Sequence, residues 1–184
     1  MKNFDSYYTL RIGQVLKVLN HLIDLGLIEP NNLKGEILDF GGAEGSCAYA
    51  LSRFGGNVTS IDTSSRARIL ENGILPEDRI IQGDGLEYLT ACPLERFDFI
   101  AAFLMYNNFP FNLFFWKATS VLKDGGQLLL TCGLESSTEI NSLHNLGIVT
   151  GFDHLGAMDY FSFTSTRRKF YKLGDFKRYL EATV

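Results

Sequence analysis

The chain has 184 residues and is 46% hydrophobic, so it is long enough to bury one sizeable core, and we expect a single domain over residues 1–184. A formal net charge of −4 provides no general attraction to nucleic acid or to an anionic membrane. The sequence opens without an apolar leader, and no apolar run approaches the roughly 20 residues of a membrane span, which favours a soluble, cytoplasmic protein. The three cysteines lack metal-like spacing, so we expect neither a disulfide framework nor a metal site.

The N-terminal segment carries an apolar stripe at helical spacing. Its members are Ile12, Val15, Leu16, Leu19, Leu22 and Ile23. Because residues three and four apart share one face of a helix, the stripe predicts an amphipathic helix from about Tyr8 to Ile23. Gly26 marks the end of this helix.

Beyond Gly35 the pattern changes to short apolar runs closed by glycine or aspartate and separated by amphipathic stretches. The runs predict strands at Glu36–Phe40, Asn57–Ile61, Arg79–Gln82, Phe97–Ala102 and Gln127–Cys132. The stretches between them predict helices at Ser46–Phe54, Ser64–Asn72, Leu86–Leu89 and about Phe111–Leu122. This alternation indicates a doubly wound, mostly parallel α/β sheet of Rossmann-like type with helices on both faces.

The last predicted strand has a different character. Residues 160–165 alternate apolar and polar side chains and lead into the basic run Arg167–Lys169. Such alternation is typical of a half-exposed strand, and we expect an antiparallel C-terminal edge strand here. The basic run has two interpretations: contact with an acidic substrate, or charges that protect an edge strand from aggregation.

The loop after the first strand is the expected ligand site, because ligands of parallel α/β sheets bind beyond the carboxyl ends of the strands. It reads Leu38-Asp-Phe-Gly-Gly-Ala-Glu-Gly45, with little of the side-chain bulk that would keep a ligand away from the backbone. The dinucleotide pattern Gly-x-Gly-x-x-Gly fits from neither Gly41 nor Gly42. Glu44 would also bring a carboxylate beside a bound pyrophosphate, which disfavours a nicotinamide-dependent oxidoreductase.

A different spacing, Gly-x-Gly-x-Gly after an acid, fits Asp39, Gly41, Ala43 and Gly45, with Ala43 in the place of the middle glycine. In these residues the sequence resembles the class I S-adenosylmethionine-dependent methyltransferases. Their cofactor has no phosphate and presents an ammonium, a carboxylate and a cationic sulfonium, with which nearby acids are compatible. The resemblance continues in the family's order through Val58–Asp62, Ile81–Gly85, Phe97–Phe103 and Leu122–Leu130.

The resemblance implies where the cofactor is held. Asp62 is expected to bind the ribose hydroxyls, Asp84 to accept from the adenine amine, and Gly85 to offer its backbone N–H to the adenine ring. The full set expected around S-adenosyl-L-methionine is Asp39, Gly41, Gly42, Ala43, Gly45, Asp62, Thr63, Asp84, Gly85 and Phe103. Each acid also has a structural interpretation: Asp39 could orient the glycine loop, Asp62 could cap the following helix, and Asp84 could be a turn residue.

The resemblance also divides the chain, with a cofactor-binding core over residues 35–184 and a helical extension, a possible lid, over residues 1–34. It places the acceptor over Leu104–Asn112 and Cys132–Asn141. An apolar, aromatic set with a few amides lies there and suits a planar or apolar acceptor: Met105, Tyr106, Asn107, Phe109, Phe111, Phe114 and Phe115. Phe114 and Phe115 fit a helix core better. No catalytic residue is identified, and Tyr106, His144 and His154 are weak candidates.

The sequence therefore predicts a methyltransferase that uses S-adenosylmethionine and acts on an unidentified acceptor, with a small molecule favoured. A nucleic acid or a protein is the alternative acceptor, and no membrane partner is expected. A second hypothesis is a non-catalytic cofactor-binding subunit of the same fold. It is motivated by Ala43 and by the lack of an identifiable base.

Overall fold

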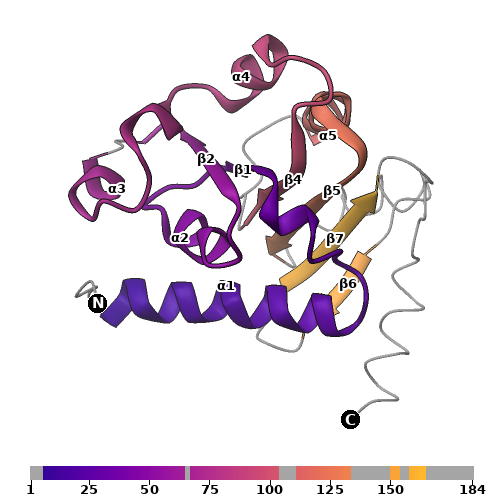
Figure 1. Ribbon diagram of the computed structural model, residues 1–184, viewed down its shortest axis with the longest axis horizontal. Helices are drawn as coiled ribbons and strands as arrows, with labels where there is room; N and C mark the ends of the chain where they lie inside the picture. The colour runs from indigo at the N-terminus through magenta and orange to yellow at the C-terminus, as the bar shows by residue number, and fades with distance from the viewer. Residues whose placement is uncertain (1–5, 65–66, 104–110, 134–149, 154–157, 165–184) are drawn as a thin grey trace.

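The computed structural model describes residues 6–64, 67–103, 111–133, 150–153 and 158–164, and Figure 1 shows a central sheet with helices on both sides. The helices are α1 (Ser6–Asp24), α2 (Ser46–Ser52), α3 (Ala67–Glu71), α4 (Gly85–Ala91) and α5 (Phe111–Val121), with short 3-10 turns at Asn32–Lys34 and Glu77–Arg79. The strands are β1 (Glu36–Phe40), β2 (Asn57–Asp62), β3 (Ile80–Gln82), β4 (Phe97–Ala102), β5 (Leu122–Gly133), β6 (Thr150–Asp153) and β7 (Met158–Thr164). None of the helices in these residues is both long and apolar enough to cross a membrane.

The sheet has the order β3-β2-β1-β4-β5-β7-β6, and its first five strands are parallel. The predicted doubly wound, mostly parallel sheet is therefore confirmed. The C-terminal segment is a strand antiparallel to β5, but its predicted edge position is wrong. β6 pairs with the outer side of β7 and forms the edge instead. The sequence signal for β6 was missed because that strand is only four residues long.

Several predicted boundaries differ from the observed ones, and at two of them local hydrogen bonding overrides the apolar pattern. Arg79 belongs to a 3-10 turn, so β3 begins one residue later than expected. β5 begins at Leu122, well before the predicted start at Gln127, because Leu122 already pairs with Phe97 of β4. The register then shifts before Gln127, and Gly125 has a φ of 82° there. The glycine turn expected before the strand is thus an irregularity inside it.

Alternate residues of the strands serve two hydrophobic cores. Ile37 of β1 faces the core shared with α1, α2 and α3, whereas its neighbour Leu38 faces the core shared with α4 and α5. Phe114 of α5 is fully buried in the second core, with its ring centroid 4.6 Å from that of Phe40. The interpretation of Phe114 as a core residue is therefore confirmed, and it contributes no surface to an acceptor site.

The N-terminal helix α1 is part of the first core. The buried members of its predicted stripe, Ile12, Val15, Leu19 and Leu22, pack there with residues of α2. Figure 1 shows α1 running along the outside of α2. Most of the free energy that holds this helix in place therefore comes from burial of its apolar face.

The segment after α1 is fastened by Gln127 of β5, which is only 3% exposed. The Gln127 side-chain carbonyl accepts from the backbone N–H of Glu29 at 2.8 Å and from the Asn32 amide at 3.2 Å. Its NH₂ group donates to the backbone carbonyl of Leu27 at 3.0 Å. Because a buried polar group without partners costs about 1–3 kcal/mol, this network specifies where the chain passes from α1 to β1.

We expect Leu19→Ala to lower the free energy of unfolding by about 2–5 kcal/mol, because it leaves a cavity at a fully buried position. The matched control is Leu10→Ala on the same helix, where the side chain is 59% exposed, and its effect should stay within about 0.5 kcal/mol. Urea denaturation of both variants measures the difference. Equal effects would show that α1 does not belong to the core.

Candidate functional site

The carboxyl ends of β1, β2 and β3 lie side by side at one edge of the sheet, and the loops that follow them are joined. Parallel pairing aligns the three strand ends. The Ala43 N–H donates to Oδ2 of Asp62 at 3.0 Å, and the Gly83 N–H donates to the Asp62 backbone carbonyl at 2.9 Å. The strand order reverses beside β1, which is where open α/β sheets bind ligands. The structure thus brings together the segments that the sequence singled out.

The loop between β1 and α2 has an unusual backbone. Gly41, Ala43 and Gly45 have φ angles of 75°, 44° and 85°, so the left-handed conformation occurs at every second residue. The N–H groups of Gly41 and Gly42 both donate to the carbonyl of Ile61 in β2, at 2.9 and 3.1 Å. The first half of the loop is therefore held by β2. Ala43 is exposed and adopts a conformation that favours glycine, the residue usual in the family the sequence resembles.

Asp39 lies beneath this loop and is 1% exposed. Its Oδ2 accepts a hydrogen bond from the hydroxyl of Ser60, the residue opposite it on β2, at 3.2 Å. A Cβ atom at Gly42 would lie 2.0 Å from the Ser60 oxygen and 2.5 Å from Asp39 Oδ2. Only glycine fits at Gly42, because these two polar side chains occupy the space where any other side chain would begin.

Burial raises the pKa of Asp39 to about 6, because the charged form loses its hydration. The Cys47 thiol and the Ser60 hydroxyl oppose this rise, the negative charge of Asp62 adds to it, and the backbone N–H of Ala48 opposes it. Asp39 Oδ1 is buried and makes no hydrogen bond of ordinary length within the described residues. The site therefore contains a carboxyl group with unused acceptor capacity directly under the glycine loop.

Asp62 ends β2 and uses both carboxylate oxygens to organise the loops. Oδ2 accepts from the Ala43 N–H, and Oδ1 accepts from the Ser64 N–H at 2.7 Å. The capping interpretation is wrong, because α3 begins only at Ala67, and Asp62 closes a turn at Ser64 instead. Each carboxylate oxygen has a second lone pair, so acceptor capacity for ribose hydroxyls is left.

Asp84 is the N-cap of α4, where its Oδ1 accepts from the N–H groups of Leu86 and Glu87 at 2.7 and 3.0 Å. Both of these hydrogen bonds use Oδ1, and Asp84 is exposed, so Oδ2 is able to accept from a ligand donor. A Cβ atom at Gly85 would lie 2.4 Å from the ring of Phe40. Gly85 is therefore required for the close approach of α4 to the end of β1.

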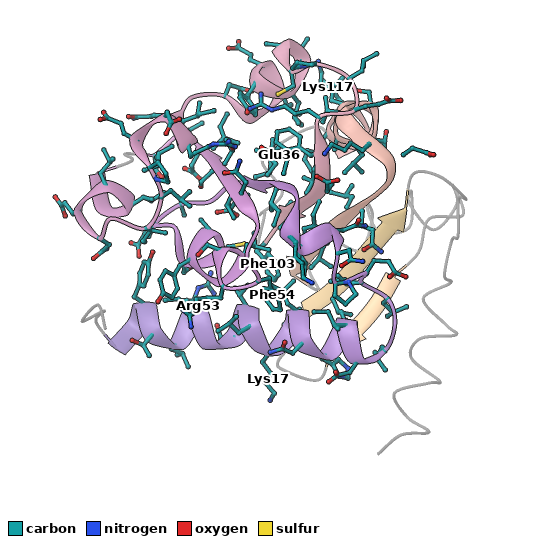
Figure 2. All side chains as sticks on the ribbon, viewed as in Figure 1. Lys17, Glu36, Arg53, Phe54, Phe103 and Lys117 are labelled. Carbon is teal, nitrogen blue, oxygen red and sulfur yellow. The ribbon has the colours of Figure 1, made fainter. Side chains whose placement is uncertain are left out.

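The remaining candidate residues lie partly near the site and partly outside the described residues. Thr63 is exposed next to Asp62. Phe103, just after β4, is partly buried against the core on the α1 side (Figure 2). Tyr106, His144 and His154 lie outside the described residues, as do most of the predicted acceptor segments and the basic run at 167–169. No group of side chains that could hold a metal ion is found in the described part of the chain.

Sequence reasoning missed Ser60, which belongs to the site because it bonds Asp39 and restricts Gly42. Its signal was available, since Thr59 and Ser60 are two adjacent polar residues in a strand expected to be buried on both faces. Buried polar side chains need hydrogen-bond partners. A polar partner on a neighbouring strand could therefore have been inferred.

The fold and the order of these loops define the class I methyltransferases, whose members use S-adenosylmethionine. A family model described as a methyltransferase domain matches residues 12–183. The chain belongs to this family. Among curated proteins, no sequence matches it.

Two solved structures illustrate the likeness in fold. One is a putative sarcosine dimethylglycine methyltransferase from Galdieria sulphuraria, at 21% identity and a TM-score of 0.53, with 72% of this chain and 54% of that chain covered. The other is a predicted O-methyltransferase from Agrobacterium tumefaciens, at 16% identity and a TM-score of 0.55, with 75% and 77% covered. This chain thus spans about half the length of the Galdieria protein. At these identities the likeness shows the fold.

Asp39 should make stability fall as pH rises. Its pKa is raised from 3.8 to about 6 in the folded protein, so the folded state binds this proton more tightly than the unfolded chain does. The favourable effect of protonation is present at low pH and is lost as pH rises through about 6. We expect the Asp39→Asn variant to gain stability relative to the wild type between about pH 4 and pH 7, by at most about 3 kcal/mol.

Urea denaturation across that pH range measures this difference. Asp124→Asn is the control, because Asp124 is exposed at the opposite end of the sheet, near the start of β5. An exposed substitution of this kind should change the free energy of unfolding by no more than about 0.5 kcal/mol. A constant difference between Asp39→Asn and the wild type would show that Asp39 does not titrate in this range.

Ala43→Gly should keep or raise the free energy of unfolding by up to about 1 kcal/mol, because glycine adopts a positive φ without strain. Gly41→Ala is the matched opposite change at a φ of 75°, and it should lower the free energy of unfolding by about 1 kcal/mol or more. Thermal and urea unfolding of both variants provide the measurement. A loss of stability in Ala43→Gly would contradict the left-handed conformation at this residue.

Proposed function

We propose that this methyltransferase binds S-adenosyl-L-methionine at the carboxyl ends of β1, β2 and β3 and transfers its methyl group to a small-molecule acceptor. The observation that supports this proposal is a glycine loop with carboxylates beside it, at the position where a dinucleotide-binding fold would bind the phosphates. The Ala43 backbone N–H in this loop donates a hydrogen bond to the Asp62 carboxylate, and Asp39 lies buried under the loop. Two carboxylates so placed repel a pyrophosphate and attract an ammonium or a sulfonium.

The chemistry of the donor set supports this cofactor. Asp62 retains lone pairs for a ribose diol, and Asp84 retains Oδ2 for an exocyclic amine. Gly85 is the first residue of α4, and the first N–H groups of a helix have no partner within it. The exposed Ala43 methyl does not crowd the loop, so the departure from glycine is compatible with binding.

When bound, S-adenosylmethionine supplies an electrophilic methyl group that an O, N or C nucleophile of the acceptor displaces in line, leaving S-adenosylhomocysteine. The part of this chain is to bind and orient. Asp62 and Asp84 would hold the two ends of the adenosine, and the loop from Gly41 to Gly45 would support the amino-acid end. Positioning of this kind can supply much of the rate without a general base.

Two observations support a small-molecule acceptor. The sequence between Met105 and Phe111 is rich in aromatic and amide side chains that suit a small planar ligand. One structure of similar fold is named for sarcosine and dimethylglycine. Transfer of a labelled methyl group into small-molecule, RNA and protein fractions of a cell extract tests the acceptor class. Label confined to RNA or protein would overturn the small-molecule proposal, and cofactor binding without any transfer would favour a non-catalytic subunit.

Calorimetry with S-adenosylhomocysteine and with NADH tests the cofactor, and only the first should bind. Asp62→Ala should weaken S-adenosylhomocysteine at least about tenfold, because a hydrogen bond to a charged acceptor contributes about 1.5–3 kcal/mol and a decade corresponds to about 1.4 kcal/mol. Asp124→Ala, an exposed acid at the other end of the sheet, should leave the affinity unchanged. Wild-type affinity in the Asp62 variant would contradict the site.

Asp84 needs a variant that preserves its capping role. Asp84→Ser keeps an N-cap for α4 and removes the second carboxylate oxygen. We expect about tenfold weaker binding of S-adenosylhomocysteine with little change in melting temperature. S-inosylhomocysteine lacks the amine, so it should bind the variant and the wild type about equally. An equal loss of affinity for both ligands would mean that Asp84 does not bind the adenine amine.

A further inference from the structure

The second half of the glycine loop is bonded by the N-terminal helix. The Tyr8 hydroxyl, on α1, donates to the backbone carbonyl of Glu44 at 2.7 Å. Tyr8 is 4% exposed, so its ring is buried although it lies in the first turns of the helix. A Cβ atom at Gly45 would lie 3.2 Å from this hydroxyl and 2.8 Å from the side chain of Ile69 in α3. The end of the loop is thus enclosed between α1 and α3.

The Tyr8 hydroxyl is presented by a rigid element. The buried stripe of α1 packs on α2, and the chain after α1 is fixed by the buried side chain of Gln127. A group carried on a packed helix holds its position more closely than one carried on a loop. Tyr8 can therefore act on Glu44 as a fixed donor.

We propose that Tyr8 is a positioning residue that holds the loop from Gly41 to Gly45 in its cofactor-binding conformation. This inference rests on the proposed function. β2 bonds the first half of the loop through Ile61 and Asp62, and Tyr8 adds a bond from the opposite side to the second half. Three of the five loop residues are glycines, which give an unrestrained loop many alternative conformations, and each bond that restricts the loop lowers the entropy that ligand binding must overcome.

This role differs from that of a lid. A lid would affect acceptor turnover, whereas a bond to the glycine loop affects cofactor affinity. It also differs from packing alone, because packing depends on the Tyr8 ring and positioning depends on its hydroxyl. The distinguishing change is therefore Tyr8→Phe, which keeps the ring and removes the donor.

We expect Tyr8→Phe to weaken S-adenosylhomocysteine about fivefold, measured by calorimetry at 20 °C where the variant remains folded. Ile12→Val is the matched control on the same helix, because it removes a buried methyl group and lowers the melting temperature but keeps the Tyr8 hydroxyl. Tyr88→Phe is the matched chemical control, because it removes a buried hydroxyl on α4, across the sheet. Both controls should bind within twofold of the wild type.

An affinity within twofold of the wild type in Tyr8→Phe overturns the positioning role and leaves the cofactor site standing. An equal loss in Ile12→Val overturns it as well, because general loosening of α1 would then explain the effect. Failure of the wild-type protein to bind S-adenosylhomocysteine removes the proposed function, and this inference with it. The three outcomes are therefore distinguishable.

Hydrogen exchange of the wild-type protein provides a test that needs no variant. The Tyr8 hydrogen bond is proposed to couple the loop to α1. Thermodynamic coupling is reciprocal, so ligand binding must then stabilise the docked helix by the same free energy by which the docked helix strengthens ligand binding. Saturating S-adenosylhomocysteine should then slow amide exchange both in residues 41–45 and in residues 9–12 of α1. Slowing confined to residues 41–45 would overturn the proposal.

Discussion

The site depends on the close approach of the Gly42 backbone to the side chains of Asp39 and Ser60. These polar atoms occupy the space in which a Cβ atom at Gly42 would lie. Because no side chain intervenes, the loop passes directly over the ends of β1 and β2, and the Ala43 N–H reaches Asp62. The parallel register that sets Asp39 opposite Ser60 is therefore also what builds the loop above them.

This arrangement is costly for the folded protein and useful for a cationic ligand. Burial and the nearby charge of Asp62 raise the pKa of Asp39, which means that its ionised form is destabilised in the fold. A positive group bound nearby would relieve that cost. Perturbed carboxyl groups are common in ligand sites for this reason. In the proposed cofactor site, the buried Asp39 would link the stability of the protein to the charge of the ligand.

The N-terminal helix connects the hydrophobic core to this polar site. Its apolar stripe contributes to the core on one face of the sheet, and Gln127 fixes the chain that leaves it. Tyr8 lies at the other end of the same helix and reaches the loop carbonyl of Glu44. The sequence predicts this helix as an extension of the domain, but in the structure the helix is packed into the core of the domain.

The α1 stripe, the five parallel strands and the loop residues Asp39, Asp62 and Asp84 could be predicted from sequence, because they follow from periodicity and from short spacings along the chain. Tertiary structure alone decided which partners meet across long separations: Ser60 with Asp39 and Tyr8 with Glu44. It also decided that β6 takes the edge of the sheet, and that β5 starts at its pairing with Phe97. Such contacts depend on strand register and helix docking, which no local pattern encodes.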